Sequence, residues 1–319
     1  MKTTGIIKIS LFSALLSFSL HLNAQYDAMF TQYMFNEVFI NPAYAGSKEA
    51  MSATLLHRQQ WVNFPGRPIT TSFSLHGPVQ GNKMGLGLSV LNEKIGVLNR
   101  SLVYGSYAYR IKINDKSTFS MGLMGGFENQ LNKYGTVKVS NDGSAPADPQ
   151  FAQNTSNVVA PNFGAGLYYT SKKYYVGLSI PRLVDNEVKF SYGGSTVKVT
   201  SITPDKFTYY LTGGYLFTIN EELKVRANTM IKTVKNAPAQ IDLGGTLLIR
   251  DLIWAGLSYR SKSSLSALLG VQATKQFFIC YSYDYGVNKI QQYSQGSHEI
   301  VLNYLFSFTS KNIITPRYF

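Results

Sequence analysis

The sequence is poor in cysteine, tryptophan and acidic residues. Its 319 residues include one Cys and two Trp, and 17 Asp+Glu stand against 30 Lys+Arg. A single thiol, Cys280, excludes a disulfide scaffold and a cysteine-based zinc site. After residue 24 there is no apolar run of the roughly 18 residues that a transmembrane helix needs, and mean hydropathy is only −0.06. These features exclude a helical membrane bundle.

Aromatic residues and glycine are plentiful, whereas charge is sparse. Aromatics make up 13% of the chain, with 22 Tyr and 19 Phe, and there are 27 Gly. Charged residues reach 15%, against roughly 25% in a soluble domain. Such a chain is too apolar to be disordered. The composition predicts a large β protein, either soluble or barrel-forming.

Residues 1–24 have the pattern of a secretory signal peptide. Lys2 and Lys8 precede an apolar stretch over residues 9–20, and Ala24 offers a small residue for cleavage. A membrane anchor is the alternative, but the stretch is short for a span. Removing the two lysines lowers the formal charge from +13 to +11 (13 − 2 = 11).

The remaining chain alternates apolar residues with small or polar ones. From Leu223 to Lys232, for example, Leu, Val, Ala, Thr and Ile alternate with Lys, Arg, Asn, Met and Lys. A period of two with one apolar face predicts β-strands. Fourteen such segments are expected, near residues 50–58, 67–76, 83–91, 98–113, 117–128, 158–171, 173–180, 206–219, 221–233, 239–250, 251–261, 265–273, 275–285 and 297–308.

Connection lengths favour a closed barrel in the outer membrane. Every second connection is a tight turn, whereas residues 129–157, 181–205 and 286–296 form long loops on the other side, and 181–205 is expected to contain its own hairpin. Short periplasmic turns, long extracellular loops and an even number of strands are typical of bacterial outer-membrane barrels. Tyrosines near strand ends fit the aromatic girdles of such barrels. A β-sandwich is the alternative, but it would not sort its loops in this way.

Residues 25–49 precede the first expected strand and are strongly apolar. Only Asp27, Glu37, Lys48 and Glu49 carry charge in this segment. Its exposure to periplasmic water would be costly. We expect a plug in or across the periplasmic mouth, or a segment that docks a partner. Residues 50–319 are then the barrel with a short C-terminal tail.

Several motifs resemble those of the PorP/SprF family of Bacteroidetes outer-membrane proteins. Phe30-Thr31-Gln32-Tyr33-Met34-Phe35-Asn36 runs into Asn41-Pro42-Ala43-Tyr44-Ala45-Gly46-Ser47, and Arg58-Gln59-Gln60-Trp61 follows. The resemblance extends over the whole mature chain, although its later Gly/Tyr motifs are less specific. It implies a type IX secretion or gliding protein that exports a secreted adhesin-type cargo, or anchors it through the cargo's C-terminal domain.

The candidate partner-binding residues come from these motifs and from the rim of the lumen. They are Phe30, Tyr33, Phe35, Asn41, Pro42, Tyr44 and Trp61 from the motifs, and Asp242, Arg260, Asp284 and Glu299 at inward positions near the extracellular rim. The alternative for the rim set is mutual charge pairing inside a polar lumen. The expected partners are the cargo, type IX secretion components and outer-membrane lipid or lipopolysaccharide, but not nucleic acid.

Catalysis has little support in the sequence. His57, His76 and His298 are far apart, and there is no recognised catalytic, phosphate-binding or metal-ligand motif. We therefore expect no enzyme activity, cofactor or metal. An outer-membrane channel for small or hydrophobic solutes is the alternative function.

Overall fold

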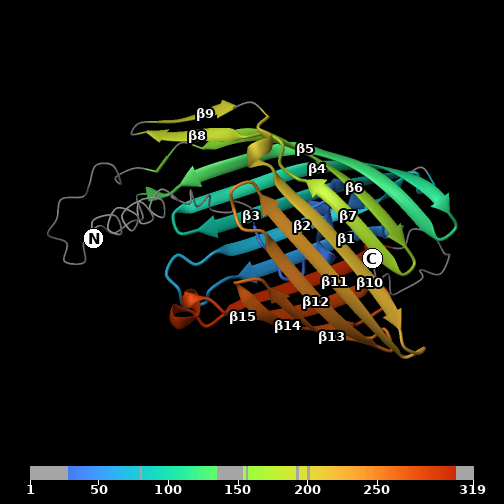
Figure 1. Ribbon diagram of the computed structural model, residues 1–319. Helices are drawn as coiled ribbons and strands as arrows, with labels where there is room; N and C mark the ends of the chain where they lie inside the picture. Colours follow the sequence, from blue (N-terminus) through green and yellow to red (C-terminus); the bar gives the residue numbers. More distant parts are fainter. Residues whose placement is uncertain are drawn as a thin grey trace, which may run out of the picture.

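Fourteen antiparallel strands close into a barrel, as the computed structural model of the chain shows (Figure 1). It describes residues 28–79, 81–134, 154–155, 157–191, 194–199 and 202–306. The expected signal peptide, the tail beyond residue 306 and most of loop 129–157 lie outside the described residues.

The barrel strands are β1 (Met51–Gln59), β2 (Ile69–Val79), β3 (Met84–Ile95), β4 (Leu98–Asn114), β5 (Ser117–Asn132), β6 (Val158–Ser171), β7 (Tyr174–Ile180), β10 (Thr208–Thr218), β11 (Leu223–Val234), β12 (Gln240–Ile249), β13 (Ile253–Arg260), β14 (Ser264–Gln272), β15 (Phe277–Gly286) and β16 (Ser297–Phe306). Each strand pairs with its neighbour in the chain, except that β7 pairs with β10, and β1 closes the barrel against β16. The prediction of a closed 14-strand barrel is confirmed, with strand ends within a few residues of those expected.

Two further strands, β8 (Asn186–Ser191) and β9 (Gly194–Val199), form the hairpin expected within the 181–205 connection. They project beyond the barrel at the end that also carries η7 (Lys289–Tyr293) (Figure 1). Because short turns are periplasmic in such barrels, we assign this end as extracellular.

The alternating pattern of the strands sorts side chains to the two faces of the wall. Outward positions carry large apolar residues, and Leu123, Phe127 and Leu257 each expose more than 60% of their surface. A continuous exposed apolar band of this kind is stable only against lipid. Among the described residues, no helix is long and apolar enough to cross a bilayer.

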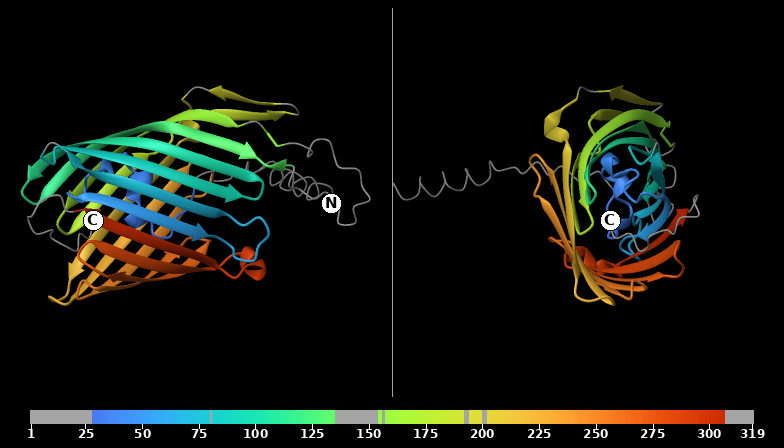
Figure 2. Two further views of the ribbon diagram at one scale, coloured as in Figure 1. Left: turned by 180° about the vertical axis from the view of Figure 1, so that it is seen from behind. Right: turned by 90° about the vertical axis from the view of Figure 1, so that its right-hand side faces the viewer.

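The lumen is occupied by the segment before β1. We call residues 28–50 the luminal plug; it contains three short 3-10 turns, η1 (Tyr33–Phe35), η2 (Glu37–Phe39) and η3 (Pro42–Tyr44). Viewed along the barrel, the plug lies inside the ring of strands (Figure 2). It contacts residues near the extracellular ends of β15 and β16 and reaches β1 at the periplasmic end, so it extends further than the periplasmic mouth.

Candidate functional site

The beginning of the luminal plug is held by a buried charge cluster. Arg58 of β1 lies 2.7 Å from Asp284 and 3.0 Å from Glu299, and all three side chains are almost fully buried. The Thr31 hydroxyl donates to Asp284 at 2.7 Å. Backbone N–H groups of Thr31 and Gln32 donate to Glu299 at 2.9 and 2.7 Å. Buried ions need such partners, so this plug backbone completes the coordination of the carboxylates.

A second ion pair holds the adjacent plug residue. Arg260 at the end of β13 lies 2.9 Å from Asp242 of β12, and both are buried. Arg260 also donates to the Phe30 carbonyl at 2.7 Å. The four rim residues proposed from the sequence are therefore brought together as two groups, and both groups contact the plug within the protein.

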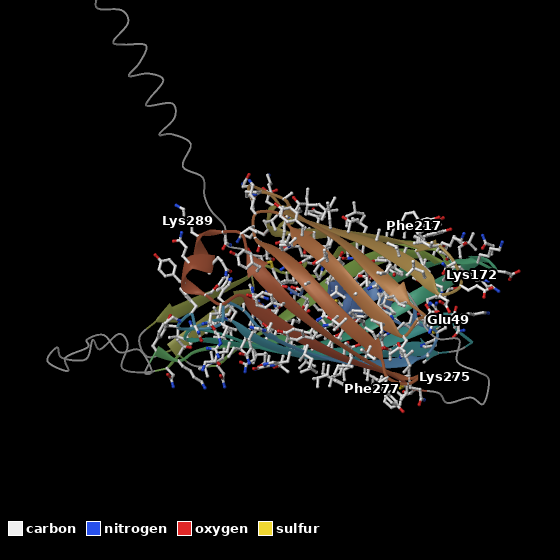
Figure 3. The ribbon with its side chains drawn as sticks, turned by 90° about the horizontal axis from the view of Figure 1, so that it is seen from below. Glu49, Lys172, Phe217, Lys275, Phe277 and Lys289 are labelled. Atoms are coloured by element: carbon white, nitrogen blue, oxygen red, sulfur yellow. The ribbon has the colours of Figure 1, made fainter. Side chains whose placement is uncertain are left out.

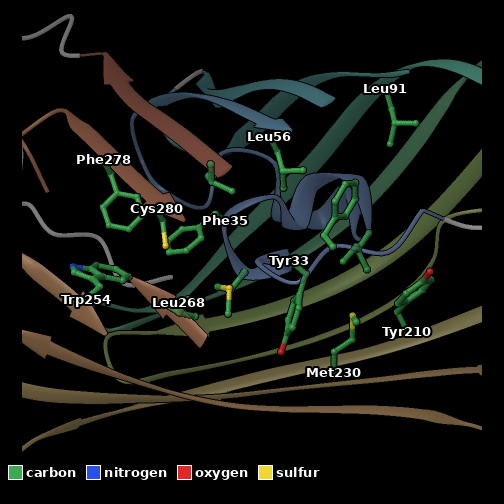
Figure 4. Packing of buried hydrophobic residues seen from close by; sticks show 14 of the residues in the cluster. Tyr33, Phe35, Leu56, Leu91, Tyr210, Met230, Trp254, Leu268, Phe278 and Cys280 are labelled. Carbon is green, nitrogen blue, oxygen red and sulfur yellow. The ribbon is translucent and has the colours of Figure 1, made fainter. Parts of the chain in front are cut away.

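Aromatic packing holds the middle of the plug against β13 and β15, on the same side of the lumen as the two charge groups. The Phe35 ring lies 4.9 Å from that of Phe278 and 5.7 Å from that of Trp254 (Figure 4). The Arg226 guanidinium lies over both Phe35 and Trp254, at 5.2 and 4.9 Å from the ring centres. Tyr33 is also buried here and accepts a hydrogen bond from Asn228 at 3.2 Å. Cation–π contacts of this kind are strongest away from water.

The end of the plug contacts the β4–β7 wall through backbone and small groups. The Asn41 amide donates to the Leu167 carbonyl at 2.9 Å, while its oxygen accepts from the Ala43 N–H at 3.0 Å. A Cβ on Gly122 would overlap the Ala43 backbone, and one on Gly166 would overlap the Asn41 side chain. These two glycines allow Asn41 and Pro42 to approach the wall closely.

Tyr44 completes this side of the site. Its ring meets Tyr168 edge to face at 5.4 Å and lies 5.2 Å from His76. The Gly46 N–H donates to His76 Nδ1 at 3.2 Å. His76 therefore faces the plug, whereas His298 contacts Tyr281 among partly exposed groups. The three histidines within the described residues, His57 included, do not converge on one site.

Trp61 lies apart from the other motif residues. It follows β1 in the extracellular connection 60–68, where its N–H donates to Ser297 at 3.1 Å and its ring meets Phe64 edge to face. Trp61 is half-buried and Phe64 is exposed. Of the candidate residues, Trp61 is the one that is not fully buried, and it lies at the extracellular end of the barrel.

The candidate residues drawn from the sequence left out Arg58, which stands in the Arg58–Trp61 motif, and Arg226, which the alternation of its strand places at an inward position. Both occupy inward positions of strands that otherwise alternate cleanly, and both are buried. A cation at an inward position opposite an apolar plug was the available signal. Their acidic or aromatic partners are far away in the sequence: Glu299, the register partner of Arg58 across the β1–β16 pair, lies 241 residues further along the chain. Periodicity alone cannot assign such pairs.

A third cluster fixes the chain where β7 ends. Arg182 lies 2.9 Å from Glu128 of β5, and Glu128 also accepts hydrogen bonds from Tyr104 and Asn162. Beyond Ile180 the backbone stays beside β6, because the Leu183 N–H donates to the Phe163 carbonyl at 2.8 Å. Beside it lies a small hollow of about 50 Å³ lined mainly by apolar side chains such as Phe30, and also by Arg182.

The described residues contain no cluster of three or more His, Cys, Asp or Glu side chains that could hold a metal. The arrangement is one of buried ion pairs and close packing between plug and barrel. These contacts can hold the plug in place or bind a partner.

Comparisons with known proteins agree with this architecture. A family model described as type IX secretion system membrane protein PorP/SprF matches residues 22–304. A search of curated proteins finds no match to the sequence.

Among solved structures, the fold is supported by one at a TM-score of 0.50. The CymD monoaromatic hydrocarbon channel is 15% identical, with a TM-score of 0.50 over 93% of this chain and 97% of that chain. A Pseudomonas aeruginosa FadL homologue is 12% identical, with a TM-score of 0.47 over 86% and 94%. Both are outer-membrane barrels.

Proposed function

Because this chain belongs to the PorP/SprF family of type IX secretion system membrane proteins, we propose that it binds the C-terminal domain of a secreted adhesin-type protein and exports or anchors it. The resemblance found in the sequence motifs is confirmed, and the family together with the closed barrel places the chain in the outer membrane. The family and the fold are typical of secretion or transport barrels rather than of enzymes. The family implies contact with secretion-system components, and gliding motility and a source in Bacteroidetes are consistent with it.

The observation that supports this proposal is the filled lumen. The plug is buried and is held by ion pairs on one side and close packing on the other, which leaves little room for a folded polypeptide to cross. Contacts with cargo are then expected at the extracellular end, where the connection between β7 and β10 carries the β8–β9 hairpin beyond the barrel wall (Figure 1). We call this connection, residues 181–207, the excursion. Long connections held by a rigid barrel are suited to recognition.

The proposal is tested by shortening this excursion. Asp185 and Lys206 form an ion pair at its base, so residues 186–203 can be replaced by a short glycine–serine linker that leaves both stems in place. We expect the cargo, identified by co-purification in mild detergent, to move from the cell surface into the medium while the barrel remains heat-modifiable.

The matched control replaces η7 (Lys289–Tyr293), at the same end but between β15 and β16, with a linker of the same type. Cargo should remain on the surface in this variant. Full surface retention after replacement of 186–203, with a folded barrel, would count against the proposal.

For the candidate residues we propose two roles. Phe30, Tyr33, Phe35, Asn41, Pro42 and Tyr44 hold the plug, and Asp242, Arg260, Asp284 and Glu299 hold its beginning; their burial supports this. Trp61 is the candidate for direct cargo contact because it lies at the extracellular end. Outer-membrane lipid, including lipopolysaccharide near exposed Lys94 and Lys262, is a further proposed partner.

A channel for small or hydrophobic solutes is the second candidate, favoured by the apolar hollow beside Arg182. Planar-bilayer recording separates the two functions. A plugged anchoring barrel should give no steady conductance, whereas a reproducible open level or saturable solute uptake would favour the channel.

A further inference from the structure

A large hollow lies on the lipid-facing surface of the barrel, on the other side of the wall from the plug. It measures about 510 Å³ and crosses β4, β5, β6 and β7. Its floor includes Ala165, which pairs in register with Leu123 and Ile180, and the backbone of Gly122 and Gly166. Larger outward side chains on the neighbouring positions, such as Tyr109 and Leu178, form its sides. We call this hollow the outer groove.

The outer groove lies in the periplasmic half of the wall. Leu178 is the fifth residue of β7 counted from the periplasmic turn, and Leu167 lies equally far from the end of β6. At about 3.3 Å per residue, the groove therefore begins roughly 13 Å along the strands from the turns. Because barrel strands are tilted by about 40°, this is about 10 Å from the turns along the membrane normal, the level of acyl chains rather than of head groups.

The turns below the groove are basic. Lys116 follows β4, while Lys172 and Lys173 follow β6, and all three are exposed. We call these three residues the lysine arc; Lys172 lies at the end of the barrel opposite Lys289 (Figure 3). The only acid on these turns, Asp115, already pairs with Lys112 at 2.8 Å.

The two turns are close enough to interact. A hydrogen bond from Lys112, together with the nearby charge of Lys172 on the other turn, holds the pKa of the Asp115 carboxyl below its ordinary value. Lys116, Lys172 and Lys173 thus contribute a net positive field beside the membrane, with no ion pair for any of the three among the described residues.

Tyrosines fill the level between the lysine arc and the outer groove. Tyr169 and Tyr174 stack at 5.7 Å, with their hydroxyls 3.5 Å apart, and Tyr174 stacks on Tyr215 at 6.4 Å. Stacked rings with exposed hydroxyls are suited to the ester level of a lipid, which is polar on one side and apolar on the other.

We propose that this face binds an anionic phospholipid of the periplasmic leaflet. One acyl chain lies in the outer groove, the ester region meets Tyr169 and Tyr174, and the phosphate meets the lysine arc. Lipopolysaccharide occupies the opposite leaflet and cannot place its phosphates at these turns. The site is separate from the extracellular end, so the inference does not depend on cargo binding.

Native mass spectrometry of the full chain in detergent tests the charge component, with palmitoyl-oleoyl phosphatidylglycerol and the matching phosphatidylcholine as probes. We expect selective retention of phosphatidylglycerol. The triple variant Lys116→Gln, Lys172→Gln, Lys173→Gln should weaken this binding roughly tenfold or more. The control Lys235→Gln, Lys275→Gln, Lys289→Gln removes three exposed lysines elsewhere and should bind as the wild type does.

The groove is tested separately with Ala165→Phe, which fills it, and Ala267→Phe, which adds the same ring to the outward face of β14. Only Ala165→Phe should reduce phosphatidylglycerol retention, and both variants should stay heat-modifiable. Equal retention of the two lipids, unchanged binding in the triple variant, or unchanged binding in Ala165→Phe would overturn the inference. So would an acidic periplasmic protein that binds the lysine arc in place of lipid.

Discussion

The two sides of the lumen hold the same plug by different means. On the side of β1, β13, β15 and β16, buried charges meet plug backbone and hydroxyl groups, as in the Arg58 cluster. On the side of β5 and β6, Gly122 and Gly166 have no side chains, so the plug can lie directly against the wall. The first side depends on electrostatic compensation and the second on shape, so they should respond differently to substitution.

The largest effect is expected from removing the element that both sides hold. Deletion of residues 26–45 leaves the Asp284 and Glu299 carboxylates without their plug donors and exposes the apolar inner wall around Trp254 and Phe278. We expect no folded barrel, measured as loss of the heat-modifiable band. A heat-modifiable barrel that survives this deletion would show that the wall does not need the plug.

Sequence reasoning was strongest where a repeating pattern carries the information. The alternation in segments such as Leu223–Val234 fixes strands, inward faces and, through loop parity, the closed barrel. It also placed Asp242 and Arg260 at neighbouring inward positions.

The pairing of plug with wall could not be predicted in the same way. Thr31 and Glu299 are 268 residues apart in the chain, and their contact depends on closure of the barrel and on the path of the plug. Likewise, the sequence identifies Gly122 and Gly166 only as glycines within strands. Their role in making room for Ala43 and Asn41 of the plug depends on the three-dimensional structure.

On the charged side, Arg58→Met should cost about 3–5 kcal/mol of unfolding free energy, because it leaves two buried carboxylates without their cation. Urea unfolding of the barrel in lipid vesicles measures this. Arg250→Met breaks the exposed pair with Glu222 and should cost at most about 1 kcal/mol. Equal costs for the two variants would mean that the cluster does not hold the plug.

On the close-packed side, Gly122→Ala should cost about 1–3 kcal/mol, since the new methyl group meets the Ala43 backbone, which has little room to move. Gly245→Ala on β12 is the matched control, because open space surrounds its Cβ position. The difference should appear in the midpoint of heat modifiability. A Gly122→Ala barrel as stable as Gly245→Ala would remove the distinction between the two sides of the lumen.

The smallest effect separates hydrogen bonding from shape on the close-packed side. Asn41→Ala removes the amide bond to the Leu167 carbonyl and the cap on the Ala43 N–H, but it leaves the glycine-lined space intact. We expect a loss of about 1–2 kcal/mol in the same urea assay, because a part-buried carbonyl and a buried N–H lose this partner. Asn92→Ala, which removes an exposed bond to Ser101, should change stability by no more than about 0.5 kcal/mol. If Asn41→Ala instead matches Arg58→Met, hydrogen bonding rather than close packing dominates this side, and the contrast between the two sides becomes one between charged and neutral hydrogen bonds.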